Sequence, residues 1–302
     1  MNLLCRAALL VLASGAWADT LAGPECVVAF PPAARGKAER IVETFRWRRD
    51  HAAWWLGLES KGRADVHLVA DHAAMKSLAP GAPSWAVAVT TGAVMVFRLD
   101  LVDRDPAGSL DLVLKHETVH FVLNRSGVRF PRWFEEGLAV HHAGLAYLEP
   151  DARIERVAAA GRLPPFAEAD GLFEMGKGEA ALGYALGQRA VREMVRRFGD
   201  GSVPRLVRSA SGGAAFPDAF ADATGETLGD FESRWRAEVT PKIPLWLFVI
   251  VENLDLALFF FGALLVAGAY ARWRFRRERA MAALGGGGAA GSDAPPTPSD
   301  AP

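Results

Sequence analysis

The chain has 302 residues, 51% of them hydrophobic and 23% charged, with a formal net charge of -1 at pH 7. This composition indicates one sizeable globular domain together with a membrane-related segment. The balanced charge excludes a protein drawn to nucleic acid by its net charge, so we expect no nucleic-acid partner.

The N-terminus has the pattern of an export signal. Arg6 precedes a short apolar run over 7–12, and Ala16-Trp17-Ala18 supplies small residues before Asp19. We therefore predict a signal peptide over 1–18 that is cleaved after Ala18. An uncleaved membrane anchor is the alternative, although the apolar core is short for one.

The sequence contains two cysteines, and Cys5 lies within the predicted signal. Cys26 would then be the sole cysteine of the mature protein, which excludes an intrachain disulfide. We expect Cys26 to be a small buried side chain or part of a disordered terminus, in preference to a thiol nucleophile.

Helical spacing of apolar residues predicts a helix over 33–58. Short runs rich in β-branched residues then predict strands over 66–70, 85–89 and 92–99. Thr90-Thr91-Gly92 suits the turn between the last two.

A largely buried helix is predicted over 110–125, with Ser109 as its N-cap and Gly127 as its stop signal. Most of its surface is apolar, and its polar residues form one narrow stripe: Asp111, Lys115, Thr118 and Arg125.

This helix carries the motif HExxH, as His116-Glu117-Thr118-Val119-His120. Two histidines four apart lie on one helix face, so both imidazoles can reach one tetrahedral Zn²⁺, with Glu117 beside them as a base. Burying a carboxylate and two imidazoles without a partner costs several kcal/mol, about 2–7 per polar group, and a metal removes that cost. A chance match on an ordinary helix surface is the competing interpretation.

A catalytic zinc site needs a third protein ligand. The extended HExxHxxGxxH pattern fails, because Leu123 and Ser126 occupy its glycine and third-histidine positions. Pro131 is well placed to begin a second helix, and fifteen residues separate His120 from Glu136, which allows an antiparallel return past the metal. We therefore predict Glu136 as the third ligand.

HETVH followed by WFEEGLA, residues 133–139, resembles the glutamate zincins, and within them the peptidase MA-like family of gluzincin metallopeptidases. The resemblance implies His116, His120 and Glu136 as zinc ligands and Glu117 as the base that activates the zinc-bound water. It extends in weaker form over about 65–238. The implied fold is α+β and zincin-like, with a small mixed sheet and active-site helices.

The resemblance also suggests roles for two further segments. Residues 183–199 are similar to a later helix of the family that opens near a tyrosine, so we hypothesise that Tyr184 donates a hydrogen bond to the oxyanion of hydrolysis. A packed aromatic side chain is the alternative. Residues 93–97 are the candidate for the edge strand that holds the substrate backbone beside the metal, or else a strand that only covers the core.

The remaining histidines lack ligand spacing. His51, His67 and His72 are expected to be structural or surface residues. His141 and His142 are expected to be exposed, with a position near the cleft as the alternative. Glu135 points about 100° away from Glu136 around the helix, which predicts a supporting or surface position.

The composition changes at Pro241. Residues 245–271 are almost wholly apolar, and Trp246 and Trp273 lie 27 residues apart, about 40 Å as helix, which matches two bilayer interfaces. We predict one transmembrane helix over 244–271. The basic residues that follow place the C-terminal side in the cytoplasm and the catalytic domain outside: Arg272, Arg274, Arg276, Arg277 and Arg279.

Glu252 and Asp255 share a face of this helix. We expect them at the outer boundary, with the hydrocarbon crossing starting near Leu254. The alternative is a contact with an intramembrane partner helix.

The predicted organisation is a signal over 1–18, an extracytoplasmic peptidase domain over 19–240, a transmembrane helix over 244–271, and a basic, disordered cytoplasmic tail over 272–302. The expected function is that of a membrane-tethered zinc metallopeptidase, and an endopeptidase is favoured over an exopeptidase. The alternatives are a non-catalytic metal-binding or assembly module of the cell envelope, a hydrolase of non-peptide amides, and a structural domain whose HETVH is coincidental.

Overall fold

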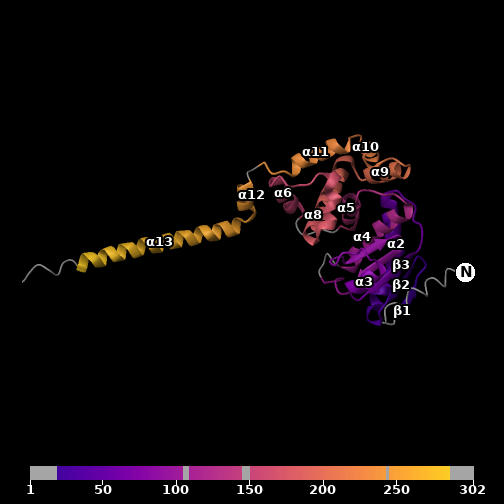
Figure 1. Cartoon of the computed structure of the whole chain (residues 1–302), viewed down its shortest axis with the longest axis horizontal. Helices are drawn as coiled ribbons and strands as arrows, with labels where there is room; N and C mark the ends of the chain where they lie inside the picture. Colours follow the sequence, from indigo (N-terminus) through magenta and orange to yellow (C-terminus); the bar gives the residue numbers. More distant parts are fainter. Residues whose placement is uncertain (1–18, 105–108, 145–149, 243–244, 286–302) are drawn as a thin grey trace, which may run out of the picture. The chain divides into compact units, whose positions relative to one another are not determined.

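The computed structural model describes residues 19–104, 109–144, 150–242 and 245–285 (Figure 1). The chain divides into two compact units, with the boundary between Lys242 and Ile243. The predicted signal over 1–18 and the end of the predicted tail over 286–302 lie outside the described residues.

In the described part of the first unit, five strands form one small mixed sheet in the order β1-β2-β3-β5-β4. β2 and β3 are parallel, as are β3 and β5, while β1 and β4 run antiparallel to their neighbours. The strands are β1 (Asp19–Ala22), β2 (Cys26–Phe30), β3 (Ala64–Val69), β4 (Ala88–Thr91) and β5 (Val94–Arg98).

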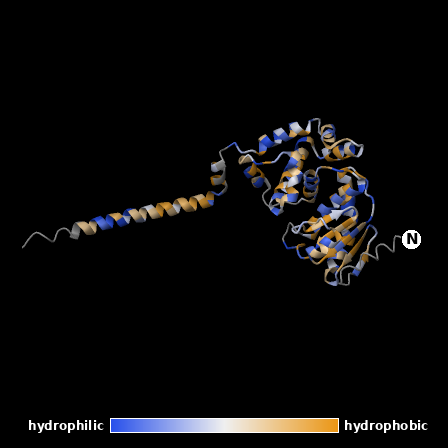
Figure 2. Ribbon diagram, in the orientation of Figure 1, coloured by the Kyte–Doolittle hydropathy of each residue, from blue (hydrophilic) through white to orange (hydrophobic). Residues whose placement is uncertain are grey.

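Helices cover both faces of the sheet, because successive side chains of a strand point to opposite faces and apolar residues lie on both. α2 (Arg35–Leu56) and α4 (Leu110–Ser126) pack on the face that carries Met95 and Phe97, and α3 (His72–Leu78) packs on the face that carries Val96. Figure 2 shows hydrophobic residues concentrated in the region of the sheet. The α+β class with a small mixed sheet is confirmed.

The two helices that carry the metal motifs lie where their signals predicted. α4 begins after Ser109 and ends at Gly127, whose backbone is left-handed with φ 78°. Ser109 makes no side-chain cap; the carboxylate of Asp103 accepts a hydrogen bond from Leu110 N at 2.8 Å instead. α5 (Arg132–Ala143) begins one residue after Pro131, not at it.

The rest of this unit is helical. It consists of the 3₁₀ helices η2 (Pro32–Ala34) and η3 (Phe166–Gly171) and of α6 (Pro150–Ala159), α7 (Leu172–Met175), α8 (Lys177–Phe198), α9 (Ser202–Ser211), α10 (Phe216–Thr224) and α11 (Leu228–Val239). α8 makes its most extensive contacts with α5, which brings the later helices to the motif-bearing pair.

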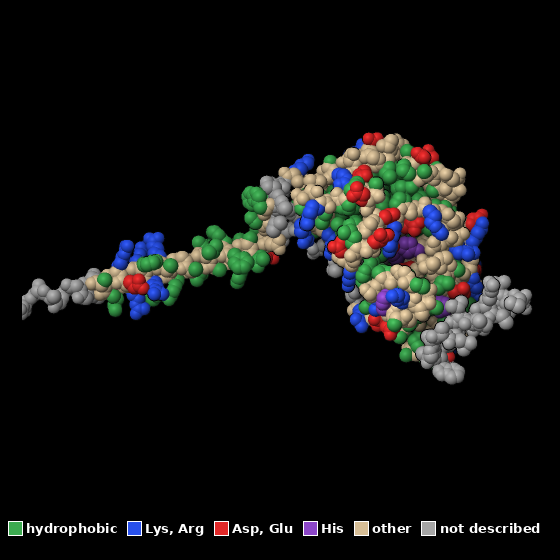
Figure 3. Space-filling view, in the orientation of Figure 1, with side chains coloured by type: hydrophobic (Ala, Val, Ile, Leu, Met, Phe, Trp, Pro, Cys, Tyr) green, Lys and Arg blue, Asp and Glu red, His purple; other side chains and the backbone are tan. Residues whose placement is uncertain are grey.

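In the second unit, α12 (Leu245–Glu252) and α13 (Leu254–Gly285) flank Asn253. The predicted single helix over 244–271 is therefore wrong in its continuity. Asparagine competes for backbone hydrogen bonds and favours helix starts, and Asn253 O here accepts from Ala257 N at 2.9 Å as α13 begins. Within α13, Leu254–Ala282 is long and apolar enough to cross a membrane. Figure 3 shows its exposed apolar side chains, followed by a cluster of basic ones.

The sheet order also corrects the prediction for the edge strand. Residues 93–97 fall on β5, which lies between β3 and β4, so β4 forms the edge. The order of the two strands in the chain predicted that β4 and β5 form a hairpin. Because β5 also pairs in parallel with β3, β4 is left at the edge of the sheet.

Candidate metal centre

Three predicted ligands meet between α4 and α5. The His116 Nε2 and His120 Nε2 atoms are 3.2 Å apart, and Glu136 Oε2 lies 3.3 Å from each. One turn of α4 separates the two histidines, and Glu136 of α5 lies against both. His116 and Glu136 are 7% and 8% exposed, so the cluster is almost wholly buried.

The spacing fits a tetrahedral ion. Ligand atoms about 2.0–2.1 Å from a tetrahedral zinc are about 3.3–3.4 Å from one another, which matches the three separations. Glu136 Oε2 is a buried atom with no hydrogen-bond partner among the described residues, as expected of an oxygen that faces a cation. His116 Nδ1 likewise has no partner there, and so lacks the acceptor that metal-binding histidines commonly have.

Opposite charges face each other within the cluster. Burial disfavours the charged form of His120, but the carboxylate of Glu136 outweighs burial and raises the pKa of His120 to about 9. Burial also disfavours the Glu136 carboxylate, yet His120 and His116 hold its pKa below the usual range. The positive charge of a protonated histidine and the negative charge of Glu136 thus stabilise each other, and a bound cation could balance the same carboxylate.

Glu117 is 5% exposed and points to the edge strand. Thr90 on β4 donates a hydrogen bond from its hydroxyl to Glu117 Oε2 at 2.6 Å. The HExxH spacing puts Glu117 beside the ligands, and the edge strand fixes its carboxylate. From the sequence Thr90 is expected only in a turn, because nothing local marks a contact with a residue 27 positions later.

Tyr184 reaches the cluster through a close helix crossing. A Cβ on Gly137 of α5 would stand 2.4 Å from Gly187 O, and one on Gly187 of α8 would stand 2.1 Å from Trp133 O. This approach places the Tyr184 ring with its centroid 6.5 Å from that of His116. Gly137 in the second motif is thus explained by packing against α8.

Arg132 is the second residue that sequence analysis missed. It stands one helical turn before Glu136, and its Nε lies 3.8 Å from Glu136 Oε1. Its guanidinium lies 4.6 Å above the ring of Phe173, which itself packs edge-on against Tyr184 at 5.2 Å. The i, i+4 spacing from the predicted ligand could have found it.

The neighbouring polar residues have structural positions. Glu135 Oε1 accepts a hydrogen bond from Phe130 N at 3.0 Å, which supports the start of α5. The predicted exposure of His142 is wrong: it is 9% exposed, because Trp55 and His51 of α2 cover its ring. The side chain of Glu252 lies outside the described residues, and Asp255 is exposed at the start of α13.

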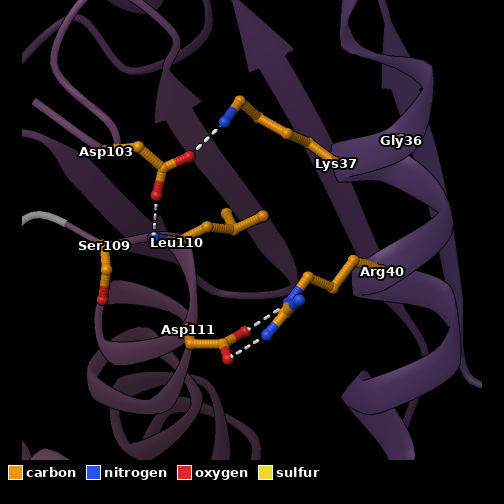
Figure 4. A pocket seen from close by; sticks show the side chains of 7 residues that line it. All are labelled: Gly36, Lys37, Arg40, Asp103, Ser109, Leu110 and Asp111. Atoms are coloured by element: carbon orange, nitrogen blue, oxygen red, sulfur yellow. Dashed lines mark hydrogen bonds and ion pairs between the residues drawn. The ribbon is translucent and has the colours of Figure 1, made fainter.

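A pocket of about 420 Å³ lies apart from the cluster, between α2 and the start of α4 (Figure 4). Its charges are already paired: Lys37 with Asp103, and Arg40 Nε with Asp111 Oδ1 at 2.8 Å. These ion pairs tie α4 to α2 and leave no free charge in the lining for a ligand.

No protein-family model matches the chain, and no curated protein matches it. The resemblance to the glutamate zincins is thus a resemblance of sequence motifs. The distances within the cluster are observed independently of that resemblance.

Proposed function

We propose that the protein is a zinc metallopeptidase of zincin-like fold, with His116, His120 and Glu136 as ligands. The observation that carries the proposal is the convergence of these three side chains at mutual distances of 3.2–3.3 Å, with Glu117 held beside them by Thr90. A bound zinc ion supplies Lewis acidity, which polarises a carbonyl oxygen and eases the deprotonation of water.

The remaining steps belong to side chains of the chain. Glu117 accepts a proton as the general base and passes it to the leaving amine nitrogen, which completes hydrolysis of the amide. Tyr184 donates a hydrogen bond to the oxyanion that develops on the substrate carbonyl. The outer edge of β4 offers backbone groups to an extended peptide, and this favours a polypeptide substrate.

We further propose that the catalytic domain faces the outside of the membrane. α13 supplies a candidate membrane span that starts at Leu254, and the arginines from Arg272 to Arg279, towards the C-terminal end of this helix, would remain in the cytoplasm. The tether would restrict the enzyme to targets close to the membrane.

The test uses the full-length chain in detergent, as wild type, Glu117→Gln and Glu39→Gln. Glu39 is an exposed glutamate of α2 and serves as the matched control. Zinc content is measured by elemental analysis, and cleavage of a random peptide pool by mass spectrometry. We expect stoichiometric zinc in all three proteins and cleavage by all except Glu117→Gln. Tyr184→Phe should retain zinc and lose turnover.

The possible results separate the rival functions. Absence of zinc from the wild type would overturn the proposal and favour a coincidental motif. Zinc in every protein without cleavage by any would favour a non-catalytic assembly module, for which the ligands suffice and the base is not needed.

A further inference from the structure

Arg132 presents a guanidinium beside the metal cluster whose N–H groups form no hydrogen bond with a described residue. Its Nε is 3.8 Å from Glu136 Oε1, which is too far for a hydrogen bond, and its side chain keeps 44% of its surface exposed. Within the described ranges the guanidinium has two contacts, the long approach to Glu136 and the ring of Phe173. Its N–H donors therefore remain available.

Two other arginines of the same unit, Arg129 and Arg98, differ from Arg132 in this respect. Arg129, three residues earlier, bonds Asn124 Oδ1 at 3.2 Å. Arg98 forms two bonds with the carboxylate of Asp100, at 3.0 and 2.7 Å. These arginines have structural partners, whereas Arg132 is held from beneath by an aromatic ring, an arrangement that fixes a guanidinium without using its donors.

The charge of Arg132 is unfavourable for the metal centre alone. A cation within a few ångströms of a dication repels it, and one beside a carboxylate ligand withdraws negative charge from that ligand. A substrate anion at the guanidinium would offset this repulsion. The planar fork of arginine matches the two oxygens of a carboxylate.

We infer that Arg132 binds a carboxylate of the substrate, so that the preferred substrates are peptides with a carboxylate close to the scissile bond. This inference rests on the proposed peptidase function. The carboxylate has two possible sources, the C-terminus of the peptide or an aspartate or glutamate side chain, and the experiment distinguishes them.

The test uses three pools of random decapeptides with the full-length, zinc-loaded protein in detergent. The first pool lacks acidic residues and has a free C-terminus, the second is its amidated form, and the third is amidated and contains aspartate and glutamate. Cleavage of each pool is followed by mass spectrometry. Wild type is compared with Arg132→Gln, Arg132→Lys and the control Arg129→Gln, and zinc content is measured in each.

We expect wild type and Arg129→Gln to prefer one carboxylate-bearing pool over the neutral pool by about tenfold or more, as is typical for a charge-assisted pair. Arg132→Gln should lose this preference and still cleave the neutral pool, and Arg132→Lys should retain part of it. Preference for the first pool identifies the C-terminal carboxylate, and preference for the third identifies a side chain. An unchanged preference in Arg132→Gln, or an equal loss on all pools, would overturn the inference.

A binding measurement separates this inference from the proposed function. The same pools are passed over zinc-loaded Glu117→Gln and over the double variant with Arg132→Gln. If wild type cleaves nothing, the proposed function fails. Arg132-dependent retention of a carboxylate pool would still support the inference, and equal retention by both proteins would refute it.

Discussion

The candidate base is positioned by two elements at once. α4 fixes the backbone of Glu117 beside the two histidines, and the hydroxyl of Thr90 on the edge strand bonds its carboxylate. A base must be held in one rotamer to accept a proton at a defined place. The hydroxyl therefore links the sheet edge, where an extended peptide would lie, to the residue proposed to act on it.

Removing that hydroxyl should impair turnover selectively. Thr90→Val keeps the shape of the side chain and loses the donor, so we expect kcat to fall by about 10- to 100-fold, the worth of a hydrogen bond to a charged group. KM and zinc content should change little, and Thr90→Ser should recover most of the rate. Thr91→Val, at the exposed neighbouring position, is the control. Equal kcat in Thr90→Val and wild type would show that Thr90 does not position Glu117.

The residues of the cluster differ in how far sequence could anticipate them. His116, Glu117 and His120 follow from spacing within one helix, and Glu136 from a second helix that returns past the first. Thr90 could not be anticipated, because its contact depends on which strand forms the sheet edge. Only the three-dimensional pairing of β5 with β3 decides that.

At the scale of elements, the crossing of α5 and α8 determines the distance between Tyr184 and the cluster. Gly137 and Gly187 face each other with no room for a side chain on either helix. Their contact lets the helix backbones approach directly, so α8 carries Tyr184 to within reach of His116. Packing between helices thus positions a proposed oxyanion donor.

Gly187→Ala should therefore separate the two helices. The added Cβ would meet Trp133 O at 2.1 Å, and this clash is with backbone, which cannot move aside locally. We expect a loss of about 1–3 kcal/mol of stability, typical of overpacking, together with lower turnover as Tyr184 moves away. Chemical denaturation and kcat measure the two effects. Gly178→Ala on the same helix meets nothing within 4 Å and should be neutral or slightly stabilising. Equal stability of both variants would contradict the close crossing.

The stability of the fold around His142, at the end of α5, should decrease at acid pH. Burial, together with the smaller effects of His51 and Lys115, lowers the pKa of His142 to about 3. The unfolded chain, with a histidine pKa near about 6.5, binds more protons between these two values. The contribution of neutral His142 is thus complete above pH 6.5 and declines as pH falls towards 3.

His142→Phe should remove this pH dependence. At pH 5 protonation of the unfolded state costs wild type about 2 kcal/mol, or about 4–8 °C in Tm, and the variant should escape this loss. Tm is measured on metal-free protein at pH 7.5 and pH 5, and the difference between the two pH values is compared. An equal drop in both proteins would show that His142 does not limit acid stability.

The elements themselves were predicted to different degrees. α4 lies within one residue of its predicted bounds, because apolar periodicity and the stop signal at Gly127 agree. The edge of the sheet and the break at Asn253 were missed. The order of strands in a sheet depends on contacts between residues far apart in the sequence. A single asparagine within a long apolar run is a weak indication of a helix break.

For the whole molecule, the chain combines a unit that could hold a metal with a unit that carries a candidate membrane span. The basic residues that follow the most apolar part of α13 indicate which side of a membrane each end of this helix would face. Translocating several arginines is unfavourable, so if α13 crosses a membrane, the proposed orientation places the arginines in the cytoplasm and the metal cluster on the opposite side.

Cysteine labelling of intact cells tests this orientation. Burial raises the pKa of Cys26 to about 11 and Cys26 is 1% exposed, so this thiol should not react with a membrane-impermeant maleimide, and Cys5 lies within the predicted signal. Lys61→Cys introduces a thiol at an exposed position of the first unit, and Ser292→Cys introduces one in the C-terminal segment. We expect Lys61→Cys to be labelled in intact cells and Ser292→Cys only after the membrane is permeabilised, because the arginines retain the C-terminal side in the cytoplasm. The reverse pattern would place the metal cluster in the cytoplasm, and labelling of both in intact cells would show that α13 does not span the membrane.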